Sequence, residues 1–156
     1  MLKVLMFIIE RYPDREVLLS RKPQELMGEL EKAGFNFSEI RDTYRWLEGM
    51  RGYQSTVDPT VFISVTRAER LYSDFEMDIL DAECRDYLFY LERCKILDSY
   101  SRELVIDRLL ALQEKVVAVS DVKWVTLLVL FHLPDRKEQL SAMQDFVLFG
   151  GKEKLH

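Results

Sequence analysis

Apolar residues recur along this chain at helical spacing, and two stretches are apolar on almost every side. The first runs from Leu2 to Tyr12 and ends before a proline, and the second runs from Asp121 to Leu133 and also ends before a proline. Because a helix that is hydrophobic all round must be buried among other helices, both stretches are predicted to be central helices of a bundle. Ser120 is expected to cap the second one.

Amphipathic segments follow the first of these stretches. Pro23 suits the first turn of a helix that we expect to reach Lys32, where Gly34 supplies a left-handed stop. Ser38 is expected to cap a third helix. Its buried stripe is predicted to consist of Ile40, Tyr44, Leu47 and Met50.

The second half of the chain opens with a capping signal. Ser73 is followed three residues later by Glu76, which is the spacing of a capping box. The helix that it opens is predicted to reach Leu97, with a break near Asp81. Such a helix would bury a stripe that includes Cys84.

Two further helices complete the predicted set. One begins at Ser99 or Ser101, and the last covers about residues 136–148. Trp46, at the margin of the apolar stripe, and Trp124 are both expected to pack in the core. Trp124 is predicted to be buried, because its neighbours in the sequence are largely apolar.

The helical periodicity is interrupted between residues 51 and 67. Turn formers such as Pro59 precede β-branched and aromatic residues there, which predicts a linker with one short β-hairpin. We therefore expect a mostly α fold, a compact multi-helix bundle that forms a single globular domain over residues 1–156. Its helical units would cover about residues 1–50 and 68–150.

Composition agrees with this fold class. The chain has 156 residues, of which 48% are hydrophobic and 31% charged, so it can bury a sizeable core. Its 6 glycines and 4 prolines are too few for the turns of an all-β sandwich. The longest apolar runs fall well short of the roughly 20 residues that span a bilayer, and the first run lacks the pattern of a signal peptide.

Charge and cysteine usage narrow the function classes. A net charge of -5 lacks the broad basic footprint of a protein that covers nucleic acid. Cys84 and Cys94 lie ten residues apart in one predicted helix, or roughly 15 Å along its axis, which is beyond disulfide reach. Reduced thiols indicate a cytoplasmic protein.

One segment, residues 74–86, contains six acidic residues and Arg85, so its local net charge of -5 equals that of the whole chain. Its acidic residues are Asp74, Glu76, Asp78, Asp81, Glu83 and Asp86. They allow two interpretations. Acidic side chains near a helix start interact favourably with the helix dipole, so the segment can be an ordinary solvated face. Alternatively, it is a docking surface for a protein with a basic surface.

A nucleic-acid-binding alternative rests on the third predicted helix. Two helices, a turn and a hairpin follow the order of a winged-helix module, in which Arg41, Arg45 and Arg51 with Trp46 would contact phosphates and bases. Acidic residues are interleaved on the same helix and would repel phosphate.

Catalytic and metal-binding patterns are missing from the sequence. The chain has two histidines, His132 after an apolar helix and His156 at its end. Neither is placed beside a nucleophile, and no paired spacing of cysteine and histidine predicts zinc. We therefore assign no catalytic residue, metal or cofactor.

Short motifs spread over nearly the whole length resemble the bacterial Smg proteins. The blocks that carry this resemblance are Val4-Leu5-Met6-Phe7, Ala33-Gly34-Phe35, Trp46-Leu47-Glu48, Cys84-Arg85-Asp86-Tyr87-Leu88, Arg102-Glu103-Leu104-Val105-Ile106, Val122-Lys123-Trp124-Val125 and Leu155-His156. The resemblance implies a cytoplasmic, mostly helical protein of a family without an established activity, often encoded beside a DNA-processing factor. It also makes the ending Leu155-His156 a candidate docking element.

Taken together, these patterns predict a non-enzymatic cytoplasmic protein-interaction or adaptor protein. Its partner would be a protein, with a basic surface if the acidic segment is the docking site. The alternative is a winged-helix-like nucleic-acid-binding protein linked to DNA processing.

Overall fold

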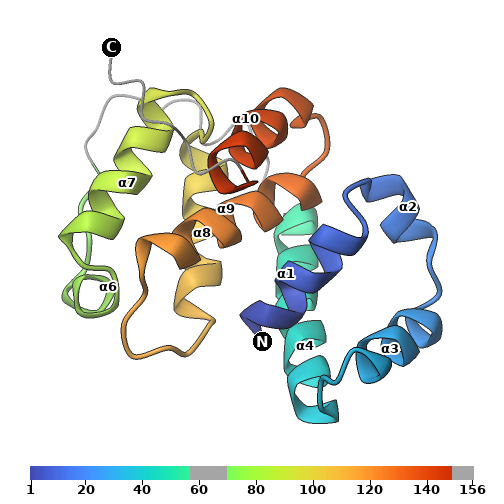
Figure 1. The fold of residues 1–156 in the computed structure, drawn as a ribbon. Coiled ribbons are helices and arrows are strands. Elements are labelled where there is room, and N and C mark those ends of the chain that lie inside the picture. Colours follow the sequence, from blue (N-terminus) through green and yellow to red (C-terminus); the bar gives the residue numbers. More distant parts are fainter. Residues whose placement is uncertain (57–69, 149–156) are drawn as a thin grey trace.

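The computed structural model describes residues 1–56 and 70–148, and within these ranges the chain is a bundle of helices without a β-strand (Figure 1). The predicted mostly α fold class is confirmed. The helices are α1 (Leu2–Arg11), α2 (Arg15–Ser20), α3 (Pro23–Lys32), α4 (Phe37–Thr56), α6 (Asp74–Ile79), α7 (Ala82–Arg93), α8 (Ser99–Leu110), α9 (Val119–His132) and α10 (Lys137–Leu148).

Helix α9 lies in the middle of the bundle and contacts α1, α7, α8 and α10 (Figure 1). All residues from Val125 to Phe131 are buried. This run covers nearly two turns of helix, so every side of α9 faces other helices. The first predicted central helix, α1, is less enclosed, because Lys3 and Glu10 lie seven residues apart on one exposed side.

One hydrophobic core draws on both halves of the chain. Leu5 from α1 and Met50 from α4 belong to the same buried cluster as Leu88 from α7 and Leu109 from α8. A smaller cluster packs α3 against α1 and α4. It consists of Val4, Ile8, Leu30 and Ile40.

The junction between α4 and α8 is fixed by two reciprocal hydrogen bonds. The indole Nε1 of Trp46 donates to the backbone oxygen of Arg108 over 2.9 Å, and Nη1 of Arg108 donates to the backbone oxygen of Trp46 over 2.9 Å. Gly49 makes room for this guanidinium, since a Cβ there would lie 1.8 Å from Arg108 Nη1. Burial of Trp46 is confirmed at 4% exposure.

Trp124 packs against the core as expected, but the prediction that it is buried is wrong. This side chain is half-buried and packs against the edge of the core. It belongs to the first turns of α9, where Ser120 is exposed and Lys123 is half-buried. These turns lie nearer the edge of the bundle than the run from Val125 onward.

The predicted linker begins too early. Helix α4 continues through Thr56, so residues 51–56 are helical. Gly52 lies inside this helix, where a glycine costs only about 1 kcal/mol relative to alanine and does not have to end it. The predicted hairpin and the remaining linker residues, 57–67, lie outside the described ranges.

Two predicted caps are wrong by a few residues. Asn36, rather than Ser38, caps α4: its Oδ1 accepts from the backbone N of Glu39 over 2.9 Å. At the start of α9, the Asp121 carboxylate accepts from the backbone N of Ala118 over 2.9 Å. This helix therefore begins before Ser120, and the side chain of Asp121 in its first turn caps it.

Helix α2 was not predicted, and helix α7 is shorter than predicted. The six residues of α2 are too few to show a periodic pattern, and Asp14 caps them by accepting from the backbone N of Glu16 over 2.8 Å. Helix α7 ends at Arg93 rather than Leu97, because Lys95 adopts a left-handed φ of 58°. The predicted break near Asp81 is confirmed by the end of α6 at Ile79.

Across residues 1–56 and 70–148, no helix is both long enough and apolar enough to cross a membrane.

Two glycine substitutions test the α4–α8 junction. Gly49→Ala should lower the free energy of unfolding by about 1 kcal/mol, because displacing the Arg108 guanidinium breaks a charged hydrogen bond and outweighs the gain in helix propensity. Gly28→Ala is the matched control: a Cβ on Gly28 meets nothing within 4 Å, so it should raise the free energy by about 0.5 to 1 kcal/mol. Equal stabilisation by both changes in urea unfolding would contradict this role of Gly49.

Candidate interaction surface

The acidic segment is held in place by two helix caps. Ser73 and Glu76 form the predicted capping box at the start of α6: the Ser73 side chain accepts from the backbone N of Glu76, and the Glu76 carboxylate accepts from the backbone N of Ser73. Asp81 caps α7 by accepting from the backbone N of Cys84 over 2.9 Å. Below these caps, Leu80 is fully buried and anchors the turn between the two helices.

Arg70 ties this segment to α8. Its guanidinium lies 2.6 Å from Glu76 and 2.7 Å from Glu103, and the side chains of Arg70 and Glu76 are each only 15% exposed. The hydrogen bonds from Arg70 lower the pKa of the Glu76 carboxyl to about 2. Glu76 is therefore a structural carboxylate at the base of α6.

The remaining carboxylates of the segment face solvent. Asp74, Asp78, Glu83 and Asp86 are exposed, and none forms an ion pair with another described residue. Of the six predicted acidic candidates, the structure thus leaves these four accessible in full, while Glu76 and Asp81 also serve the local fold.

Large apolar side chains lie exposed among these carboxylates. Leu71 is 90% exposed, Phe75 65% and Met77 43%, and α6 contains no buried residue. Single exposed apolar residues are common on protein surfaces, but three within seven positions beside unpaired carboxylates are typical of a binding surface. We call Leu71, Asp74, Phe75, Met77, Asp78, Glu83 and Asp86 the acidic–apolar surface.

The sequence pattern did not single out these apolar residues. Phe75 and Met77 lie two positions apart and project from different sides of α6, which contains no buried residue. Ile79, four positions after Phe75, has the spacing of a buried stripe, so the local pattern gives no signal that Phe75 is exposed.

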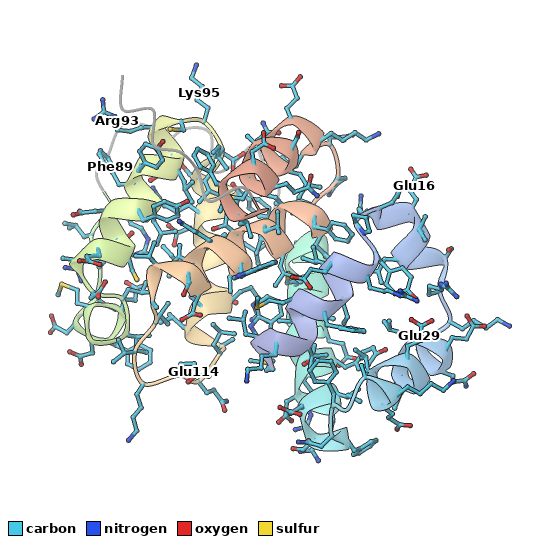
Figure 2. All side chains as sticks on the ribbon, in the orientation of Figure 1. Glu16, Glu29, Phe89, Arg93, Lys95 and Glu114 are labelled. Carbon is cyan, nitrogen blue, oxygen red and sulfur yellow. The ribbon has the colours of Figure 1, made fainter. Side chains whose placement is uncertain are left out.

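Basic residues limit the surface at the other end of α7. Figure 2 labels Phe89 and Arg93 on the last turns of this helix and Lys95 in the turn that follows, and all three point away from the bundle. Phe89 is 54% exposed, and the Arg93 guanidinium lies 5.9 Å from its ring centroid. The charge along α7 therefore changes from acidic at its start to basic at its end.

The arginines of the nucleic-acid alternative are only partly assembled. Arg41 and Arg45 are exposed on one side of α4, and Arg41 lies 3.4 Å from Asp42. Trp46 is buried against Arg108 and cannot stack on a base, so that part of the prediction is wrong. Arg51 belongs to α4, and its side chain lies outside what the structure describes.

Leu155 and His156 also lie outside the described ranges, so their docking role stays a prediction. Among the described residues, no group of three or more His, Cys, Asp or Glu side chains is placed to hold a metal ion. Cys84 is buried and donates to the backbone oxygen of Val117 over 3.2 Å, and burial raises the pKa of its thiol to about 12. Such a thiol is protonated at neutral pH and is a poor nucleophile.

Comparison with known proteins defines the family. A family described as "Protein of unknown function (DUF494)" matches residues 1–156. The chain is also similar to proteins named "Protein Smg homolog" in Shewanella woodyi, with 36% identity over 100% of this chain and 99% of the relative, and in Pseudoalteromonas translucida, with 35% identity over 100% of both chains. A relative of the same name in Shewanella oneidensis is 38% identical over 100% of this chain and 99% of its own length.

These matches place this helical chain in a family that is described as being of unknown function. The chain belongs to the Smg family, as its sequence motifs predicted. No solved structure matches it.

The Glu76 carboxylate gives a pH-dependent test of this geometry. Its pKa is lower in the folded chain than the ordinary value of 4.5, so its stabilising effect is present above about pH 4.5 and is lost as the pH falls toward 2. Glu76→Gln should lower the free energy of unfolding by about 1 to 3 kcal/mol at pH 7, and the difference from wild type should shrink below pH 4.5.

The matched control is Glu83→Gln, which removes an exposed and unpaired carboxylate and should change stability by less than about 0.5 kcal/mol. Denaturant unfolding between pH 2 and 7 measures both variants. If Glu76→Gln behaved like the control throughout, the Arg70 contact would have no stabilising role.

Proposed function

We propose that the chain is a non-enzymatic cytoplasmic adaptor that binds another protein through the acidic–apolar surface. The observation that carries this proposal is the exposure of Leu71, Phe75 and Met77 on a segment in which four exposed carboxylates form no ion pair with a described residue. Apolar side chains supply affinity when they are buried in an interface, and surrounding charges speed encounter and select the partner.

Charge complementarity defines the partner's docking segment. Four exposed carboxylates favour a segment with lysine or arginine side chains, and the neighbouring apolar residues favour leucine, methionine or aromatic side chains on its other face. A basic amphipathic helix or an extended basic segment with apolar anchors combines both properties. The free thiols of Cys84 and Cys94 agree with a cytoplasmic setting.

Site-specific photo-cross-linking in native cells tests the proposal. A photoreactive amino acid in place of Phe75 should cross-link one protein through a segment that is both basic and apolar. The same amino acid in place of Val17 is the control, because Val17 is also an exposed apolar residue, at 47%, but lies on α2 at the opposite side of the bundle (Figure 1). Equal cross-linking from both positions would contradict the proposal.

Charge variants then test how the carboxylates of this chain contribute to binding of the partner that the cross-linking identifies. Replacing Asp74, Asp78 and Glu83 by Asn, Asn and Gln should slow association about tenfold at low salt and remove most of its salt dependence. Stability should change by no more than about 1 kcal/mol. A control with Gln at Glu16, Glu31 and Glu138 changes the net charge equally at exposed sites elsewhere.

Two outcomes would overturn this assignment. The first is that the triple variant and its control variant associate with the partner at the same rate. The second is capture that nuclease abolishes and that depends on Arg41 and Arg45, which would support the winged-helix-like nucleic-acid-binding alternative instead.

A further inference from the structure

A partly enclosed cavity of about 320 Å³ lies among α1, α2, α3, α4 and α9, away from the acidic–apolar surface. Its walls are mostly apolar. Among the residues that line it are Leu5, Ile8, Leu18, Leu26, Leu47 and Leu128. This volume is at the lower end of the range of about 300 to 1,000 Å³ that is usual for small-molecule sites.

Two arginines from α2 and its end line the same cavity. Arg15 is half-buried, and its Nε atom is buried without a hydrogen-bond partner among the described residues. Arg21 is more exposed, lies 3.7 Å from Glu25, and holds its guanidinium 5.2 Å from the ring centroid of Tyr12. The one acidic side chain in the lining, Glu48, is exposed to solvent.

The charge of Arg15 indicates what the cavity accepts. An arginine side chain keeps its charge at all physiological pH values, and Arg15 forms no ion pair with another described residue. A carboxylate supplies acceptor oxygens in the planar arrangement that a guanidinium matches. A carboxylate in the cavity would therefore pair with the guanidinium of Arg15, which lines it.

Contacts on the outer side keep the cavity open. The Tyr12 hydroxyl donates to the Glu29 carboxylate and so links the end of α1 to α3. The Tyr44 hydroxyl donates to the backbone oxygen of Pro23 over 3.4 Å, which links α4 to the start of α3. Helix α2 is held between these links, so its arginines stay at the edge of the apolar space.

We propose that this cavity binds a single-chain amphiphile with a carboxylate head, with the chain along the apolar walls and the head at Arg15. The space suits one chain of medium length rather than a two-chain lipid. This inference is independent of the proposed protein partner, because it involves other helices.

Arg15 also borders a second depression of about 470 Å³, whose lining is more polar than that of the first cavity. Charged side chains line it, including Asp135, Arg136 and Lys137. A ligand held there would not depend on Leu26, which lines only the first cavity, whereas Leu140 lines only the second.

The binding test compares four probes by calorimetry and by methyl NMR of the full chain. Decanoate should bind and shift the methyl signals of Leu5 and Ile8. Decanol has the chain without the charge and should bind at least tenfold more weakly, and acetate, which has the charge without the chain, should not bind measurably. Decyltrimethylammonium tests whether Glu48 rather than Arg15 selects the head group.

Variants assign the site. Arg15→Gln should weaken decanoate binding about tenfold and leave decanol binding unchanged, whereas Arg11→Gln removes an exposed charge of α1 outside the cavity lining and should have no effect. Leu26→Trp should fill the cavity and abolish binding, and Leu140→Trp should not. Circular dichroism and thermal unfolding verify that each variant is folded.

The inference is overturned if decanoate leaves the cavity methyl signals unchanged, or if the alkylammonium probe binds as tightly as decanoate. It is also overturned if Arg15→Gln and Arg11→Gln have the same effect. The probe comparison uses the wild-type chain, so it decides the question even if Leu26→Trp fails to fold.

Discussion

The burial of α9 on every side is the constraint on which the rest of the structure depends. Seven consecutive residues of this helix, from Val125 to Phe131, must all be removed from water. No single neighbour can cover them, so α1, α7, α8 and α10 are arranged around the helix (Figure 1). The helices at the two ends of the sequence thereby share one core. Arg108 and Trp46 add a polar junction to this core, since each side chain bonds the backbone of the other's helix.

Both proposed binding sites involve one of the two shortest described helices, α6 and α2. Helix α6 has no buried residue and presents carboxylates and apolar side chains to solvent. Helix α2 lies at the opposite side of the bundle (Figure 1). Its Arg15 lines the apolar cavity. Polar contacts fix both helices, Arg70 with Glu76 at α6 and Asp14 at the start of α2. Each helix also packs one partly buried residue against a core cluster, Ile79 from α6 and Leu18 from α2. The two proposed sites therefore lie on different helices and can be tested independently of each other.

Sequence patterns predicted the fold class and the central helix, because a long apolar run has only one stable environment in a water-soluble bundle. Sequence patterns failed where the end of a helix or the role of a side chain depends on residues that are distant in the sequence. Gly52 signals a turn locally, yet α4 continues past it. Arg70 and Glu103 are 33 positions apart, so the ion pair that ties Arg70 to α8 has no local signature. Arg70 in turn makes Glu76 a structural carboxylate. The cavity combines five helices, one of them too short to show a periodic pattern.

The most direct test of the central claim is amide hydrogen exchange on Leu128→Ala. Leu128 is a buried residue of α9 on the side that lines the cavity with residues of α1 and α4. If α9 is the shared core, the substitution should lower the free energy of exchange by the same amount, about 2 to 5 kcal/mol, in the protected amides of α4 and of α8. A loss confined to α1–α4, with α7 and α8 protected as in the wild type, would contradict the claim and would show two independently stable units.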